Sequence, residues 1–242
     1  MSQAQSSGAT IFRTTFRELM KGVCTCIPGN VRTFDAELQR AQVQIGIQSV
    51  SVSGATIEPP PIVDVPVLFL GGTQYSVAHQ IDPGDEGLIL FSQRCIDAWK
   101  QTGGVASNPL ARFHSAHDAL FIPGFRPLAT RISGFANDGI RLQSRDGSVH
   151  VWIKSSGEII ADNGAAHVQI TAAGEVNIEN GAGHIKMGAD GTVNINGVTF
   201  APDGKMTSTT TMTVDDVIFS GISAKGHKHP GDSGGTTGGP EN

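Results

Sequence analysis

Residues 147–197 consist of three consecutive units of 17 residues that align without gaps. A glycine opens each of the units 147–163, 164–180 and 181–197 and recurs ten positions later. A histidine occupies the fourth position of every unit. Apolar residues alternate with polar ones between the glycines, which predicts a strand, a turn, a second strand and a second turn in each unit. The aligned apolar columns are Val151, Val168 and Ile185; Ile153, Ile170 and Met187; and Ile159, Val176 and Val193.

Repeats of this kind bury an apolar face only by stacking or by pairing with other chains. Three units make a short single-chain β-helix, and a composition of 38% hydrophobic and 6% aromatic residues supplies little for a large core. We therefore predict an intertwined β-helix of three chains, a prism with the apolar columns turned toward its axis. The other strand parity then faces water, and it includes the three repeat histidines. We interpret these as solvent-facing side chains rather than a metal ladder: His150, His167 and His184.

The region before the repeats reads as short strands separated by turns. Residues 63–70 and 88–91 are apolar strand segments, residues 82–87 form a Pro-Gly turn, and we expect another turn at residues 26–30. About five strands without a convincing long helix fit a small barrel such as the OB-fold. Nucleic-acid binding by such a barrel needs basic and aromatic residues interleaved on its strands. Those are missing and the net charge is −5, so we expect contacts with protein.

Several reactive residue types in this region suit structural roles. An odd number of cysteines does not describe a disulfide framework, so Cys24, Cys26 and Cys95 are predicted to be buried free thiols. We expect packing and hydrogen bonding, rather than a metal or acid–base site, from His114, His117 and Asp118. The longest apolar stretch, near residues 65–70, is far shorter than the roughly 20 residues that span a bilayer. We expect the chain to be made as a soluble protein in the cytoplasm.

The end of the chain carries a His-x-His pair, His227 and His229, followed by Pro230 and Gly231. In an extended backbone, side chains at i and i+2 point to the same side, so both imidazoles can approach one point. Two imidazoles alone make a weak metal site. Three copies around a three-fold axis offer six nitrogens, which suits a first-row divalent ion such as iron, nickel or copper. Structural zinc prefers four ligands, so six symmetric ones disfavour it.

Segments on both sides of the repeats are similar to the membrane-piercing central spike proteins of contractile-tailed bacteriophages. The resemblance in the N-terminal half rests on residues 63–67, 83–91, Trp99, 112–119 and 122–124. It implies an OB-fold that joins the spike to the hub or tube of the tail. The tip resembles that family through residues 220–223, 226–229 and 231–237. It implies one iron ion per trimer in an octahedral site of six histidines, His227 and His229 from each chain.

These observations predict an all-β chain in four parts. Residues 1–22 form an N-terminal arm, 23–127 the OB-fold attachment domain, 128–213 the trimeric β-helix and 214–242 the tip with its metal site. The resemblance implies a structural spike in the tail baseplate of the virion. It would contact the tail hub or tube proteins and, transiently, the bacterial outer membrane, and it would bind no nucleic acid. A coordinatively full metal leaves no position for substrate, so we expect no enzymatic activity.

Three other functions remain open from the sequence. The spike of a contractile secretion or injection system resembles phage spikes in fold. A non-haem iron enzyme is a second alternative, with His227, His229 and Asp232 as ligands, although such sites lie inside a barrel rather than at a chain end. A glycan-binding or glycan-cleaving tail spike is the third. It needs paired carboxylates in a groove, and the repeats offer only scattered acids such as Glu158 and Glu175.

Overall fold

The computed structural model describes residues 8–51, 53–226, 228, 229 and 235. The chain divides into two compact units, Met1–Arg131 and Ile132–Asn242. His227, one of the two predicted metal ligands, lies outside the described residues, and so does most of the segment that follows His229.

The first unit contains a five-stranded antiparallel sheet in the order β5-β2-β1-β8-β9. Its strands are β1 (Cys26–Asp35), β2 (Arg40–Ile45), β5 (Ile62–Pro66), β8 (Glu86–Phe91) and β9 (Ala119–Pro123). A parallel bridge from Val67 to Phe121 brings the end of β5 to β9, and the Leu68 N–H donates to the Phe121 carbonyl at 2.9 Å. The two edge strands therefore meet, and the sheet curls into an OB-like barrel, as the sequence predicted.

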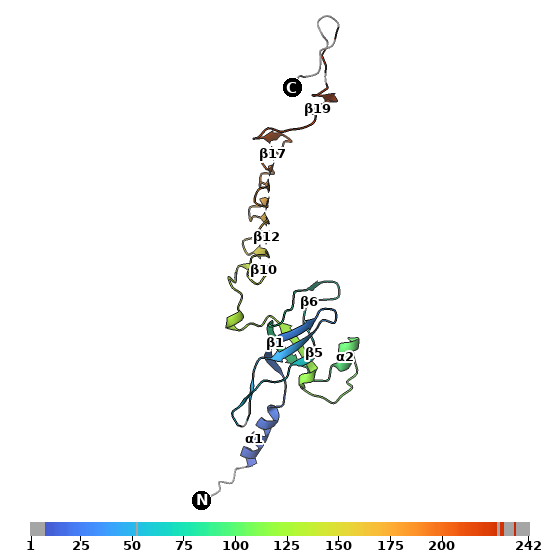
Figure 1. Cartoon of the computed structure of the whole chain (residues 1–242), viewed down its shortest axis with the longest axis vertical. Helices are drawn as coiled ribbons and strands as arrows, with labels where there is room; N and C mark the ends of the chain where they lie inside the picture. The colour runs from blue at the N-terminus through green and yellow to red at the C-terminus, as the bar shows by residue number, and fades with distance from the viewer. Residues whose placement is uncertain (1–7, 52, 227, 230–234, 236–242) are drawn as a thin grey trace. The chain divides into compact units, whose positions relative to one another are not determined.

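Shorter elements decorate this barrel (Figure 1). Helix α1 (Gly8–Met20) precedes it, and two hairpins interrupt it, β3 (Ser49–Val50) with β4 (Thr56–Ile57) and β6 (Leu70–Gly71) with β7 (Ser76–Val77). Helix α2 (Asp97–Thr102) and the 3₁₀ turn η1 (Ala116–Asp118) lie between β8 and β9. A second 3₁₀ turn, η2 (Leu128–Thr130), follows β9. The whole of α1 lies within the arm predicted for residues 1–22.

The barrel has a closed core. Val31, Val43, Val65, Ile89 and Phe121 are all at most 1% exposed, and they come from five different strands. The expected turn at residues 26–30 is wrong, because these residues open β1. Pro28 pairs with Leu88 and Gly29 with Gly87 across the β1–β8 ladder. A Cβ at Gly87 would overlap the ring of Phe121, so the missing side chains there make room for the core.

The second unit is an antiparallel meander of nine strands in chain order (Figure 1). Consecutive strands pair from β10 to β18, and a separate two-stranded hairpin, β19 (Ile218–Phe219) with β20 (Ile222–Ser223), follows. The strands are β10 (Gly139–Gln143), β11 (His150–Lys154), β12 (Ile159–Asp162), β13 (His167–Ile170), β14 (Val176–Glu179), β15 (His184–Met187), β16 (Val193–Ile195), β17 (Val198–Phe200) and β18 (Met206–Ser208).

The repeat glycines make the turns of this meander. Gly157, Gly174 and Gly191 have φ of 89°, 88° and 83°, and each donates its N–H to the carbonyl three residues earlier. Residues with a side chain rarely adopt this left-handed backbone conformation, which explains why glycine recurs at this position of every unit. The predicted alternation of strand and turn is confirmed in all three repeats.

Candidate metal centre and the faces of the meander

The meander has two chemically different faces. Two ladders of directly paired residues share one face, and they contain nearly all of its apolar side chains. The first ladder is Leu142, Val151, Ala161, Val168, Ile178, Ile185, Ile195 and Val198. The second is Ile140, Ile153, Ile159, Ile170, Val176, Met187, Val193, Phe200 and Met206.

This apolar face is open to solvent in the single chain. Val168 is 42% exposed and Ile185 is 41% exposed, although both sit in the middle of hydrogen-bonded strands. None of the described residues after Arg131 is buried. A groove of about 740 Å³ runs over the face, and its lining includes Val151, Val168 and Ile178. One copy of the chain therefore leaves the hydrophobic surface of this unit without a core.

The repeat histidines lie on the opposite face, as predicted. Paired residues alternate there in one ladder, His150–Asp162–His167–Glu179–His184. The His167 Nε2 lies 3.7 Å from the Glu179 carboxylate, and the His184 Nε2 lies 3.0 Å from the Asn194 Oδ1. A strand that carries Asp162 or Glu179 lies between successive histidine strands. Successive histidines are therefore two strand spacings apart, or roughly 10 Å. The three imidazoles are therefore too far apart to share one ion.

The polar face is tied together by its own side chains. Trp152 lies beneath two cations, with the Arg141 guanidinium 4.8 Å and the Lys154 ammonium 4.6 Å from its ring centroid. Lys154 also donates to Glu158 at 2.6 Å, and Glu158 accepts a second hydrogen bond from Gln169. These bonds hold the pKa of the Glu158 carboxyl below its ordinary value, with the Lys154 bond as the largest cause. Glu158 is thus part of the hydrogen-bonded side-chain network of the polar face.

The predicted metal ligands follow the hairpin of β19 and β20. Ser220 and Gly221, with φ of 49° and 87°, form the two-residue turn between the strands. The Ala224 N–H donates to the Val217 carbonyl at 2.7 Å and closes the hairpin toward the chain end. His229 and its neighbour Lys228 are exposed.

An aspartate fixes the base of this hairpin. The Asp216 Oδ1 accepts hydrogen bonds from the N–H groups of Val217 and Lys225, both at 2.9 Å. A hydrogen bond from the Ser223 hydroxyl, followed by the Lys225 N–H, lowers the pKa of Asp216. The carboxylate thus joins residue 216 to residue 225, two positions before the His-x-His pair. Sequence reasoning missed Asp216, because the Lys225 amide becomes its neighbour only when the hairpin closes.

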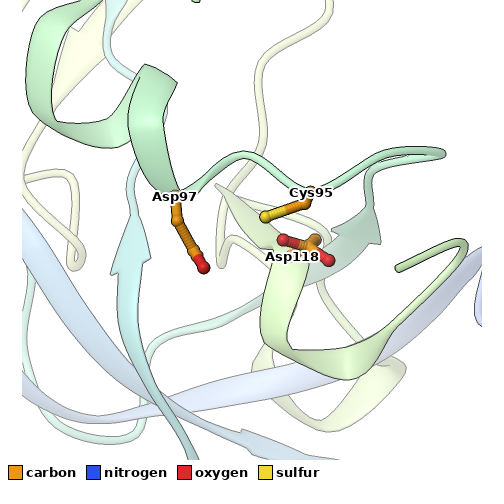
Figure 2. Close-up of side chains that lie close together, drawn as sticks. All are labelled: Cys95, Asp97 and Asp118. Atoms are coloured by element: carbon orange, nitrogen blue, oxygen red, sulfur yellow. The ribbon is translucent and has the colours of Figure 1, made fainter. Parts of the chain in front are cut away.

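A second group of metal-binding residue types lies in the first unit (Figure 2). Cys95, Asp97 and Asp118 bring their ligand atoms within 4.8 Å of one another, and they form the single such group among the described residues. The Arg112 guanidinium sits between them, with Nη2 at 2.8 Å from Asp118, 2.9 Å from Asp97 and 3.2 Å from the Cys95 sulfur. A cation already occupies the centre, so this cluster is an internal ion pair.

Asp118 is the buried partner of that ion pair. Its side chain is 0% exposed and accepts from Arg112 and from the Ile96 N–H at 3.0 Å. Burial alone raises the pKa of this carboxyl, but these hydrogen bonds and the charge of Arg112 outweigh it, and the pKa lies below its ordinary value. Hydrogen bonds to Asp118 and Asp97 and the charges of these two carboxylates raise the pKa of Arg112. The structural role predicted for Asp118 is therefore confirmed.

The neighbouring residues complete the outcome for this region. His114 Nδ1 lies 3.2 Å from the Cys24 carbonyl, and His117 contacts the Ser115 hydroxyl, so both take the packing and hydrogen-bonding roles predicted. The thiol prediction is partly wrong. Cys95 is buried, but Cys24 is only half-buried and Cys26 is exposed. Cys26 is the first residue of β1, at the end of the barrel where its side chain meets no core.

The helices of the described residues include none that is both long and apolar enough to cross a membrane.

Two segments of the chain match known protein families. Residues 27–124 match the phage protein Gp138 N-terminal domain, and residues 221–241 match the GpV Apex motif. Both are characteristic of phage baseplate spike proteins, so the resemblance found in the sequence is confirmed. The Apex motif is the metal-binding tip motif of such spikes and covers His227 and His229. No curated protein matches the chain closely.

The residues of the tip fit the iron that the resemblance implies. Imidazole is a suitable ligand for iron and other first-row divalent ions. One copy of the chain carries two such histidines, too few for a complete coordination shell, whereas three copies would carry six.

Proposed function

We propose that three copies of this chain form the central spike of a contractile phage tail, and that contraction drives this spike through the outer membrane of the host. The observation that carries the proposal is the apolar face of the meander. Two apolar ladders run from β10 to β17 on one face, and no described residue of this unit is buried. Three such faces turned toward one axis would supply the missing core.

The mechanical task follows from the architecture. Every strand of the meander is hydrogen-bonded to its neighbours in the sequence, so the wall of each copy is continuous from Gly139 to Ser208. Packing three walls through their apolar faces gives a stiff rod in which unpaired hydrophobic surface no longer contacts water. Energy for penetration comes from the contracting tail, and the spike itself needs no nucleotide and no catalytic residue.

The tip needs a different source of stability. A rod that narrows to a point has too little interior for a hydrophobic core. We propose that His227 and His229 of each copy hold one iron ion, which cross-links the three chain ends. Structural metal sites contribute on the order of 10 kcal/mol in small domains. The barrel unit would attach the spike to the hub or tube proteins of the tail and would bind no nucleic acid.

Native mass spectrometry combined with elemental analysis tests both parts of the proposal. We expect a particle of three chains, resistant to detergent, that contains one iron ion. Replacing His227 and His229 by Ala should remove the iron and leave the trimer folded. His184→Ala is the matched control, because it removes an exposed imidazole from the polar wall and should leave the iron content unchanged. A folded monomer would refute the trimer, and full iron content in the double variant would refute the site.

A further inference from the structure

Helix α1 is the part of the first unit that the barrel does not use. None of its 13 residues is buried. Phe12 is 72% exposed, Phe16 54% and Leu19 69%, although such side chains usually lie inside proteins. An isolated helix of this length is marginally stable in water, so α1 needs a partner that covers its apolar stripe.

The spacing of the apolar residues indicates what that partner is. Ala9, Phe12, Phe16, Leu19 and Val23 are separated by three, four, three and four residues, the a and d positions of a heptad. The rings of Phe12 and Phe16 stack on this stripe at 6.4 Å. A seam with this spacing packs against identical helices by inserting each side chain between four side chains of its neighbour.

The charged residues of the helix leave the seam clear. Glu18 and Lys21 form an ion pair of 2.7 Å on the surface away from it, and Arg17 occupies another outer position. Arg13 is next to the seam, but the positions that face it from a neighbouring parallel helix are taken by Gly8 and Thr15. Identical copies in parallel therefore bring no like charges together across the contact.

We propose that the α1 helices of three copies pack around a shared axis as a short parallel coiled coil. The proposal rests on the trimer proposed above, which supplies the other two helices. Two heptads are too few to hold free peptides together. Attachment of each helix to an assembled trimer raises its effective concentration to the millimolar range. Weak contacts between the helices are then enough for the coil to form. In this arrangement, the helices that precede the three barrels in the sequence pack together.

A photo-crosslinking amino acid placed at position 19 tests this interface in the full-length, purified protein. Position 19 lies in the seam, and position 17 on the outer surface is the matched control. We expect covalent dimers and trimers on a denaturing gel from position 19 and none from position 17. A trimeric native mass without chain-to-chain product at position 19 overturns the coil and leaves the spike intact. A monomeric native mass overturns the spike itself.

The same probe distinguishes other occupants of the stripe. Tail proteins or phospholipid vesicles are added to the labelled spike before illumination. If position 19 crosslinks to a tail protein or to lipid in place of a second chain, the coil is wrong and the helix docks elsewhere.

Hydrogen exchange of the α1 amides gives an independent readout. Leu19→Ala should speed exchange across residues 9–20 by at least about tenfold, because a seam side chain is lost from each of three helices. Arg17→Ala should leave exchange within about twofold. Equal exchange in the two variants contradicts a packed seam.

Discussion

The two units of the chain solve the burial of apolar strand faces in opposite ways. In the first unit, five strands curl until β5 meets β9, so Val31 and Phe121 become buried within one copy. In the second unit, nine strands follow one another in chain order, and Ile185 stays 41% exposed. The barrel closes because strands far apart in the sequence, β5 and β9, meet. In the meander, each strand pairs only with the strands before and after it in the sequence. The apolar strand faces of the first unit are therefore buried within one copy, whereas those of the second unit stay exposed in one copy.

The largest expected effect breaks this comparison at strand β15, where Ile185 and Lys186 are neighbours on opposite faces. Both are exposed in one copy, so a monomer should tolerate Ile185→Asn and Lys186→Asn about equally. In the trimer, Ile185→Asn loses a core side chain and buries an amide, at about 2–5 kcal/mol in each of three copies. Lys186→Asn should cost less than about 0.5 kcal/mol. Native mass and thermal unfolding check this, and equal melting of the two variants would contradict an apolar axis.

Next in size is the buried ion pair that fixes the loops of the barrel. Arg112→Met leaves the Asp118 carboxylate, 0% exposed, without its partner, and breaking a buried pair in this way costs about 3–5 kcal/mol. Arg94→Met is the control. Its guanidinium lies over the Phe113 ring at 4.4 Å near the surface, and its loss should cost about 0.5–1 kcal/mol. In calorimetry, only the melting temperature of the barrel should fall. Trp99 fluorescence should report the same transition.

The pH dependence of the same pair has a definite sign. The pKa of Asp118 is lower in the folded protein than in the unfolded chain, so its ionisation stabilises the barrel above about pH 4. That contribution is lost as the pH falls through the folded value. The stability difference between the wild type and Asp118→Asn should therefore shrink on acidification. A difference that grows as the pH falls toward about 4 would mean that the pKa of Asp118 is raised in the folded barrel.

Local sequence signals were sufficient in the repeats of the second unit and insufficient in the barrel of the first. Gly157 and Gly174 mark turns because the chain reverses within four residues, and the partner strand follows immediately. Pro28-Gly29 carries the same kind of turn signal, but it lies in β1, because Gly29 faces Gly87, which is 58 positions away. The role of Gly29 depends on distant strands, because a Cβ there would overlap the Ile89 side chain and the Gln44 carbonyl. Asp216 and Arg112 were missed for the same reason, since their partners meet them only after folding.

A smaller effect sharpens the contrast between the closed barrel and the open meander. Gly87→Ala places a methyl group against the Phe121 ring, and overpacking of this kind costs about 1–3 kcal/mol. Gly72→Ala, in the β6–β7 hairpin of the same unit, meets no atom within 4 Å and has ordinary backbone angles. It should leave the melting temperature of the barrel unchanged. Equal melting temperatures of the two variants would show that the barrel interior accommodates a methyl group at position 87.

The smallest expected effect concerns the tip, where Asp216 fixes the base of the β19–β20 hairpin. Asp216→Asn weakens the acceptor of the Val217 and Lys225 N–H groups, and a hydrogen bond of this kind contributes about 1 kcal/mol. We expect the iron of the variant to be removed by a chelator several-fold faster at pH 7, because the segment leading to His227 and His229 is held less firmly. Asp215→Asn, one position earlier, is the matched control and should behave as the wild type.

Because the pKa of Asp216 is lowered in the folded protein, its advantage over asparagine exists above about pH 4 and fades below it. Hydrogen exchange of residues 216–226 in the metal-free protein separates the two steps. If exchange rises in Asp216→Asn while chelation is unchanged, the aspartate shapes the hairpin without positioning the metal ligands.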